Sequence, residues 1–178
     1  MLWNDLEMEI NICNKCNLER IRKNPIVGRG NKNAHIMFVL DDISEVEDRK
    51  EELLSDKNGE YFKKFMEFSE FNIDDSYFTT LSKCSSHGEL ISDESRMLCS
   101  EYLMTQIAII NPKYIVAVGE EVTHFFLPNE KITDIRDIVG NTYSYIGDIT
   151  VIPIYDLSYL FKADSKEKWK LVNILKKL

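Results

Sequence analysis

The chain has 178 residues, of which 44% are hydrophobic and 29% are charged. This length suits one domain with a full-sized core, so we expect residues 1–178 to form a single domain. No apolar run approaches the roughly 20 residues that a membrane span requires, and the acidic N-terminus lacks the basic region of a signal peptide. We therefore expect a cytoplasmic protein without a membrane partner, whose cysteines are not paired in disulfides.

The net charge of −8 bears on the choice of partner. Affinity for nucleic acid comes mainly from Lys and Arg side chains on phosphates, so the acidic balance disfavours DNA. DNA stays a candidate through a local basic patch. An acidic surface favours a protein partner instead.

In chain order, strand patterns alternate with helical ones. Apolar periodicity predicts a short helix over 2–12, and the glycines of Val27–Gly30 predict a loop. The run at 35–40 is apolar throughout and is typical of a strand buried on both faces. Similar patterns predict further strands at 76–81, 113–118, 143–146 and 149–154, and helices at 60–71, 93–110, after Gly119 and after Asp164-Ser165.

This alternation indicates an α/β fold with a mostly parallel sheet. In such sheets, ligands bind at the carboxyl ends of the strands. Those ends carry Asp41 and Asp42, the stretch from Thr80 to Cys84, Gly119 and Asp156.

Four cysteines form the patterns Cys13-x2-Cys16 and Cys84-x14-Cys99. The strand at 76–81 brings Cys84 to a sheet end, and the next helix brings Cys99 beside it, so we expect one shared metal site. Zinc ribbons usually pair two short Cys-x-x-Cys knuckles, which the fourteen-residue gap fits poorly. Scattered thiolates suit a [4Fe–4S] cluster. Zinc and four unrelated thiols are the alternatives.

Further motifs follow in a fixed order. They are Leu18, Arg20 and Val27-Gly28-Arg29-Gly30, then Ala34-His35-Ile36-Met37-Phe38-Val39, then Tyr77-Phe78-Thr79-Thr80-Leu81-Ser82-Lys83-Cys84, and the segment from Cys99 through Gln106 and Pro112 to Gly119. Together with the first cysteine pair, they resemble the iron–sulfur, family 4 type of uracil-DNA glycosylase over about residues 13–175. The resemblance implies a three-layer α/β/α sandwich with a central four-stranded, mostly parallel sheet. It also implies a [4Fe–4S] cluster away from the catalytic pocket.

Differences from that family fall at its catalytic positions. Its Gly-Glu-x-Pro-Gly loop is replaced by Leu40-Asp41-Asp42-Ile43-Ser44, which keeps a carboxylate at Asp41. The family's uracil-reading Asn is Thr80 here, and a hydroxyl cannot reproduce an amide's donor–acceptor pair. Its base-stacking aromatic residue corresponds to Leu54. Its His-Pro motif becomes Asp156-Leu157, and an ionised Asp156 would repel the uracil anion that the histidine stabilises.

Two interpretations of these carboxylates remain. In an active glycosylase, Asp41, Asp42 or Asp156 would orient water, and Asp41 and Asp156 are the catalytic candidates. In a structural role, Asp41 and Asp42 cap a turn, and Asp156 caps the segment from Leu157 to Phe161. The ligand-binding candidates are Asp42, Thr80 and Lys83, the last as a phosphate contact.

The sequence therefore favours a uracil-DNA-glycosylase-like iron–sulfur protein that is catalytically degenerate. It would act as a DNA- or protein-binding module in DNA repair or replication. The alternatives are an active glycosylase for uracil or another damaged base and a redox or metal-sensing module, so whether the chain is an enzyme stays open.

Overall fold

The computed structural model describes residues 2–178, and its centre is a mixed sheet with the strand order β1-β3-β2-β4-β6-β5. The four central strands are parallel: β3 (Ser76–Thr80), β2 (Ile36–Leu40), β4 (Tyr114–Val118) and β6 (Thr150–Ile154). Their carboxyl ends meet at one edge, as the alternating pattern predicts.

The sheet has six strands, so the prediction of four was wrong in number. The additional strands β1 (Arg29–Gly30) and β5 (Tyr143–Ser144) are antiparallel edge strands of two residues each. β5 lies within the strand that was predicted at 143–146, whereas β1 was not predicted, because its two residues are too few to show an alternating pattern. β1 lies where a loop was predicted, and Gly30 lets it approach β3, because a Cβ there would meet the carbonyl oxygen of Ser76.

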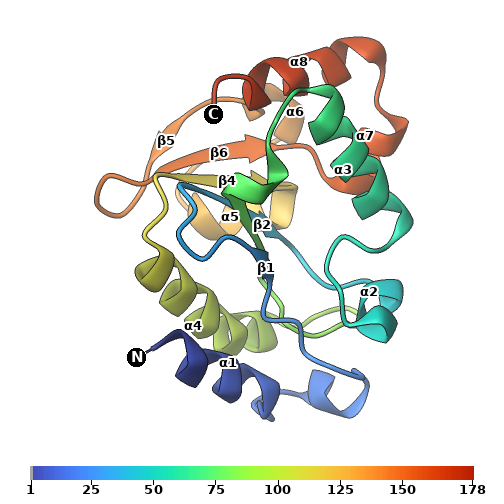
Figure 1. The fold of residues 1–178 in the computed structure, drawn as a ribbon, viewed down its shortest axis with the longest axis vertical. Helices are drawn as coiled ribbons and strands as arrows, with labels where there is room; N and C mark the ends of the chain where they lie inside the picture. The colour runs from blue at the N-terminus through green and yellow to red at the C-terminus, as the bar shows by residue number, and fades with distance from the viewer. Residues whose placement is uncertain (1) are drawn as a thin grey trace.

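Helices cover both faces of the sheet (Figure 1). α3 (Lys57–Phe68), α7 (Leu157–Lys162) and α8 (Ser165–Leu175) pack on one face, while α4 (Asp93–Ile110) and α5 (Glu120–Phe126) pack on the other. The remaining helical segments are α1 (Trp3–Asn11), η1 (Asn17–Arg20), α2 (Glu45–Lys50), η2 (Ile73–Asp75) and α6 (Ile135–Ile138). The predicted three-layer α/β/α arrangement is confirmed.

The strand β2 shows why the sheet must be covered on both sides. Ile36, Phe38 and Leu40 enter the core under α3, α7 and α8, whereas Met37 and Val39 enter the core under α4 and α5. All five side chains are buried. Alternate residues of a strand point to opposite faces, so a continuous apolar run needs a helical layer on each.

Helix boundaries follow local capping. α4 begins after Ser92, whose side chain accepts a hydrogen bond from the backbone N–H of Ser95, and it ends at Asn111 with φ 50° before Pro112. α3 begins three residues before the predicted position, because Asp56 caps it. Of the helices in residues 2–178, none combines the length and apolar character needed to cross a membrane.

Candidate metal centre and strand-end pocket

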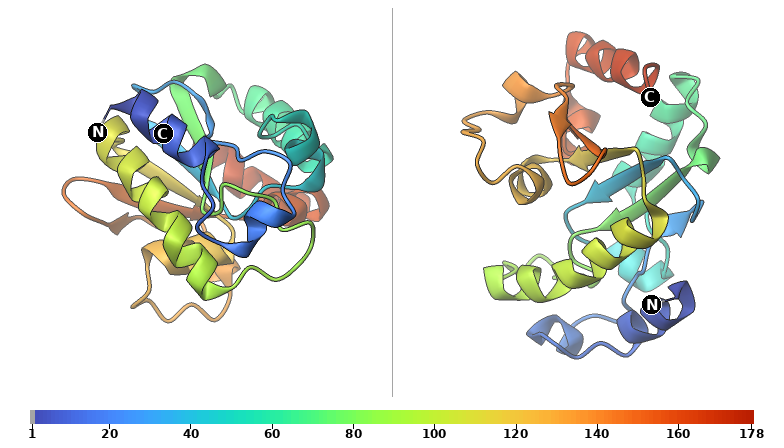
Figure 2. Two further views of the ribbon diagram at one scale, coloured as in Figure 1. Left: turned by 90° about the horizontal axis from the view of Figure 1, so that it is seen from below. Right: turned by 90° about the vertical axis from the view of Figure 1, so that its left-hand side faces the viewer.

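The four cysteines come together from three parts of the chain. Cys13 and Cys16 flank the turn between α1 and η1, Cys84 follows β3, and Cys99 lies within α4. α1 and α4 run side by side (Figure 2), and Leu6 and Ile10 pack on Tyr102 between them. All four cysteines line one narrow cavity, whose other lining residues include Ile10, Leu18, Leu98 and Tyr102. The four cysteines therefore lie together, as expected for one shared site, and their role as metal ligands stays a prediction.

The cavity disfavours thiolates unless a cation is present. Burial raises the pKa of the Cys84 thiol to about 12, against the opposing effect of Arg22, and burial also raises the pKa of Cys99. The backbone N–H of Lys83 donates a hydrogen bond to Sγ of Cys99 at 3.2 Å. An N–H donor to sulfur stabilises a metal-bound thiolate. The donor set fits a thiolate-ligated metal group.

Four cysteine thiols can hold two kinds of metal site, a single zinc ion or an iron–sulfur cluster. Within residues 2–178, no group of three or more Cys, His, Asp or Glu residues is arranged to hold a metal ion, although four cysteines surround one cavity. A single zinc ion needs its sulfurs about 3.8 Å apart, given Zn–S bonds of about 2.3 Å. A four-iron cluster is bound by thiolates that lie farther apart. Four cysteines around one cavity are compatible with either group.

A second site, the strand-end pocket, lies at the carboxyl ends of β2, β4 and β6 and has a volume of about 260 Å³. Its lining residues are Leu40, Asp41, Asp42, Ser44, Glu47, Asp56, Asn58, Val118, Asp156, Leu157 and Ser158. Five of these residues are carboxylic acids. Within the described chain, no Lys, Arg or His belongs to the lining.

Three of the pocket carboxylates cap the N-termini of helices. Oδ1 of Asp156 accepts the backbone N–H of Ser158 at 2.7 Å, as expected for a cap of α7. Oδ1 of Asp56 accepts the N–H of Gly59 at 2.8 Å and caps α3. Glu47 completes a capping box with Ser44 at the start of α2. The structural interpretation of Asp156 is confirmed in its geometry.

Asp41 and Asp42 have partners in α4 and in residues 84–92, the segment from Cys84 to the start of α4 that is called the cysteine loop below. Asp41 forms an ion pair with Arg96 of α4, whose Nη2 lies 3.3 Å from Oδ2 of Asp41. Oδ2 of Asp42 accepts the hydroxyl of Ser86 at 2.7 Å. Burial raises the pKa of Asp42 and outweighs the hydrogen bond from Ser86, and the neighbouring Asp41 adds to the rise.

Thr80 and Lys83 do not reach the pocket. Both are buried, and Oγ1 of Thr80 is buried without a hydrogen-bond partner among the residues described. Nζ of Lys83 donates to Oγ1 of Thr79 at 2.7 Å and to the carbonyl oxygen of Thr80 at 2.5 Å. A phosphate contact requires an accessible ammonium group, which this position of Lys83 does not provide. Leu54 is fully buried as well, in the core.

Residues 27–178 match the protein family described as the uracil DNA glycosylase superfamily. The chain belongs to this superfamily. The type-4 uracil-DNA glycosylase of Thermotoga maritima is 31% identical over 161 residues, which cover 90% of this chain and 83% of the relative. The enzyme of the same name from Saccharolobus solfataricus is 31% identical over 154 residues (83% and 71%), and that from Archaeoglobus fulgidus is 27% identical over 173 residues (93% and 87%).

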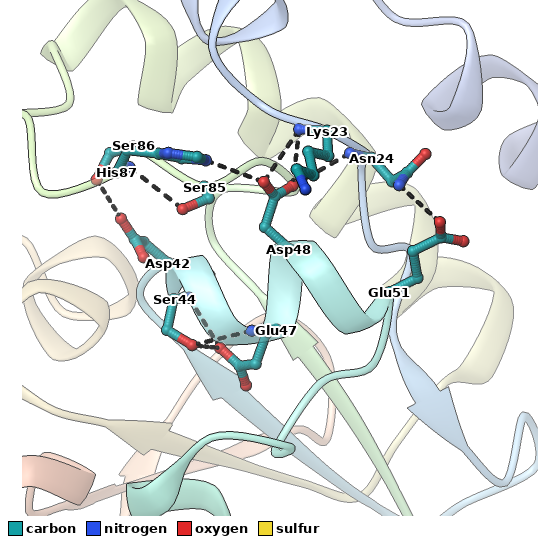
Figure 3. A network of polar contacts seen from close by, with 10 residues as sticks. All are labelled: Lys23, Asn24, Asp42, Ser44, Glu47, Asp48, Glu51, Ser85, Ser86 and His87. Atoms are coloured by element: carbon teal, nitrogen blue, oxygen red, sulfur yellow. Dashed lines mark hydrogen bonds and ion pairs between the residues drawn. The ribbon is translucent and has the colours of Figure 1, made fainter.

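In this glycosylase-superfamily chain, a polar network surrounds α2 (Figure 3). It connects the cysteine loop with Asp42, Ser44 and Glu47, three lining residues that form the pocket rim. The buried carboxylate of Asp48 accepts the backbone N–H groups of Lys23 and Asn24 at 3.0–3.1 Å, and Nε2 of His87 lies 2.9 Å from its Oδ2. These hydrogen bonds outweigh the effect of burial and lower the pKa of Asp48. Ile43 and Ser85 form a parallel β-bridge in the same region.

Sequence reasoning missed both the Asp48–His87 contact and the Asp41–Arg96 pair. Their partners are separated by 39 and 55 residues, respectively, and belong to no common motif. Only the fold brings them together, so no local signal in the sequence could have identified these pairs.

Proposed function

We propose that this chain is an iron–sulfur member of the uracil-DNA glycosylase superfamily whose strand-end pocket does not excise uracil. Its scaffold would act as a binding module in DNA repair or replication. The observation that carries the proposal is the composition of the pocket lining. Five carboxylic acids line the pocket, and none of its lining residues among residues 2–178 is Lys, Arg or His.

This lining opposes both charges that uracil excision must accommodate. Uracil leaves as an anion, and preorganised donors or cations lower the barrier to its departure. The DNA backbone is also anionic and requires cations or N–H groups at its binding surface. Three helices begin at the pocket, and an open helix N-terminus would attract anions. Here Asp156, Asp56 and Ser44 with Glu47 occupy those N–H groups.

We assign a [4Fe–4S] cluster to Cys13, Cys16, Cys84 and Cys99. Support comes from their common cavity, its apolar neighbours and the N–H donor to Cys99. When bound, such a cluster would serve as a covalent cross-link between distant segments. Apolar residues around the cavity, among them Ile10, Leu18 and Tyr102, would hold the four thiols in position.

A second candidate function is an active glycosylase that uses carboxylates. It is favoured by Asp42, whose raised pKa suits a general acid or base and whose side chain lines the pocket beside Asp41. In that case Asp41 or Asp156 would orient water toward the sugar carbon.

A glycosylase assay separates the two functions. Protein purified without oxygen, with its iron content measured, is incubated with single-stranded and duplex oligonucleotides that contain uracil, and abasic sites are counted. The Thermotoga maritima relative serves as the positive control. We expect no release above the buffer blank.

Release of uracil that disappears in Asp41→Ala or Asp156→Ala would contradict the proposal. The matched control is Asp148→Ala, because Asp148 is exposed in the loop that follows β5 and does not line the pocket. Release that persists in both pocket variants would exclude the carboxylate mechanism and still show an active enzyme.

A further inference from the structure

An apolar groove lies between α3 and α8, on the face opposite α4. Its volume is about 380 Å³, and its apolar lining consists of Tyr61, Phe65, Phe68, Trp169 and Val172. α3 and α8 lie together over the same face of the sheet (Figure 1). No residue of this α3–α8 groove lines the strand-end pocket.

Large aromatic side chains remain exposed at this groove. Phe68 is 66% exposed and Trp169 is 55% exposed, and their rings pack edge to face with centroids 6.1 Å apart. At the other end of α3, Tyr61 packs against Phe161 of α7 with centroids 5.1 Å apart. A concave aromatic surface that stays in water is typical of an interaction site.

The elements around the groove are basic, in contrast to the rest of the chain. Residues 57–68 and 157–178 contain nine lysines and four carboxylic acids, whereas all other positions contain 13 basic and 26 acidic side chains. Two of these lysines, Lys64 and Lys168, line the groove. Neither of the two forms an ion pair with a carboxylate in the described part of the chain. The groove therefore presents apolar area together with two lysines that form no ion pair with a carboxylate among residues 2–178.

We propose that the α3–α8 groove docks an acidic amphipathic segment of a partner protein. Apolar side chains of that segment would fill the groove, and its carboxylates would pair with Lys64 and Lys168. Helical segments bind such grooves through apolar residues at i, i+3 or i+4 and i+7. This inference goes beyond the proposed function, because it holds whether or not the pocket excises uracil.

Single-stranded nucleic acid is the less suitable occupant. Bases stack on open ring faces along a continuous basic track. Here Nζ of Lys168 lies 5.6 Å from the centroid of the Tyr61 ring, and Nζ of Lys57 lies 4.7 Å from that of Phe161, so lysines already cover two of the rings. The groove lining is largely apolar, as a hydrophobic peptide face requires.

The test uses a random 12-residue peptide library displayed on phage and the full chain in its metal-loaded form. We expect enrichment of peptides that combine Asp or Glu with spaced Leu, Phe or Trp. Synthetic versions of the enriched peptides should bind the Phe68→Ala/Trp169→Ala variant about tenfold more weakly or worse, since buried aromatic residues dominate interfaces. Met97→Ala, which removes an apolar side chain that is 70% exposed on α4, should leave binding unchanged.

A charge-reversed variant tests the ionic part of the proposal. Lys64→Glu/Lys168→Glu should lose the acidic peptides and select basic ones from the same library. Folding of each variant is checked by urea unfolding. The proposal would be overturned if no peptides were enriched. It would also be overturned if the enriched peptides bound both double variants as tightly as the wild type. Binding of a (dT)12 oligonucleotide that the same variants abolish would overturn it as well and would assign the groove to nucleic acid.

Discussion

At the residue scale, the carboxylates of the pocket are explained by the helices that begin there. A helix N-terminus has unpaired N–H groups and a partial positive charge, and both favour a carboxylate. Asp56 and Asp156 each satisfy such N–H groups, and Glu47 also accepts the N–H of Leu54 at 2.6 Å. Local structure therefore accounts for acidic side chains at positions where a glycosylase needs donors and cations.

Asp156 provides a direct test of this interpretation. Asp156→Ala removes the cap of α7 and should lower the free energy of unfolding by about 1 kcal/mol, as measured by urea denaturation. Asp156→Ser keeps a capping oxygen and should recover most of that loss. Equal stability of the Ala variant and the wild type would show that the observed hydrogen bond to Ser158 contributes nothing.

Asp42 predicts a pH dependence with a defined sign. Burial raises the pKa of Asp42 in the folded protein above its ordinary value of about 3.9. The folded protein thus holds this proton more tightly than the unfolded chain. The resulting contribution to stability is complete below the ordinary pKa and is lost as the pH rises through the raised pKa.

Asp42→Asn removes the ionisable group and retains an oxygen that can accept from Ser86. We expect this variant to be more stable than the wild type at pH 7, by on the order of 1 kcal/mol, and the gap to shrink as the pH falls toward 4. Urea unfolding at pH 7, 5.5 and 4 measures the gap, with the exposed Asp148→Asn as control. A variant that is less stable at pH 7, or a gap that does not change with pH, would refute this account of Asp42.

At the scale of elements, the sequence predicted what periodicity and caps encode. The central strands were predicted because their apolar runs are continuous, and α4 was predicted because Ser92 and Pro112 bracket it. The strand predicted at 143–146 is present as β5, although it is shorter than predicted. The edge strand β1 was not predicted, because its pairing with β3 depends on a neighbouring backbone and not on a side-chain pattern. Arg96 escaped prediction for a similar reason: its partner Asp41 is brought to it only by packing of α4 on the sheet.

The cysteine site joins the segment after α1, the loop after β3 and α4, so loss of its metal should destabilise several elements together. Cys84→Ser should remove the visible absorbance and most of the iron. It should also lower stability by a few kcal/mol, since cross-links over long loops contribute about 3–5 kcal/mol. Iron and zinc are counted by elemental analysis of protein prepared without oxygen. A colourless wild type with one zinc per chain would exclude the cluster.

At the scale of the whole molecule, two segments that carry cysteines are connected to α2 and the pocket rim. Asp48 of α2 accepts hydrogen bonds from the backbone that follows η1. In the cysteine loop, His87 contacts Asp48 and the hydroxyl of Ser86 donates to Asp42 (Figure 3). The α3–α8 groove shares none of these contacts. We therefore expect the metal site and the pocket rim to respond together to a perturbation, and the groove to respond separately.

Removal of iron tests this division. After chelation under reducing conditions, amide hydrogen exchange should accelerate in residues 13–24, in 84–92 and in α2, while α3 and α8 keep their protection, because exchange reports local opening. In an Asp48→Asn variant, α2 should already exchange faster before chelation and should change less when iron is removed. Oδ1 of Asp48 accepts the backbone N–H groups of Lys23 and Asn24, and Oδ2 accepts that of Lys23 and lies beside His87. An Asn side chain keeps one accepting oxygen and replaces the other with an N–H₂ group, which cannot accept. Faster exchange that is confined to the residues beside the cysteines would show that the polar network does not transmit the loss of metal. Uniform acceleration, with α3 and α8 included, would show that the metal stabilises the fold as a single unit.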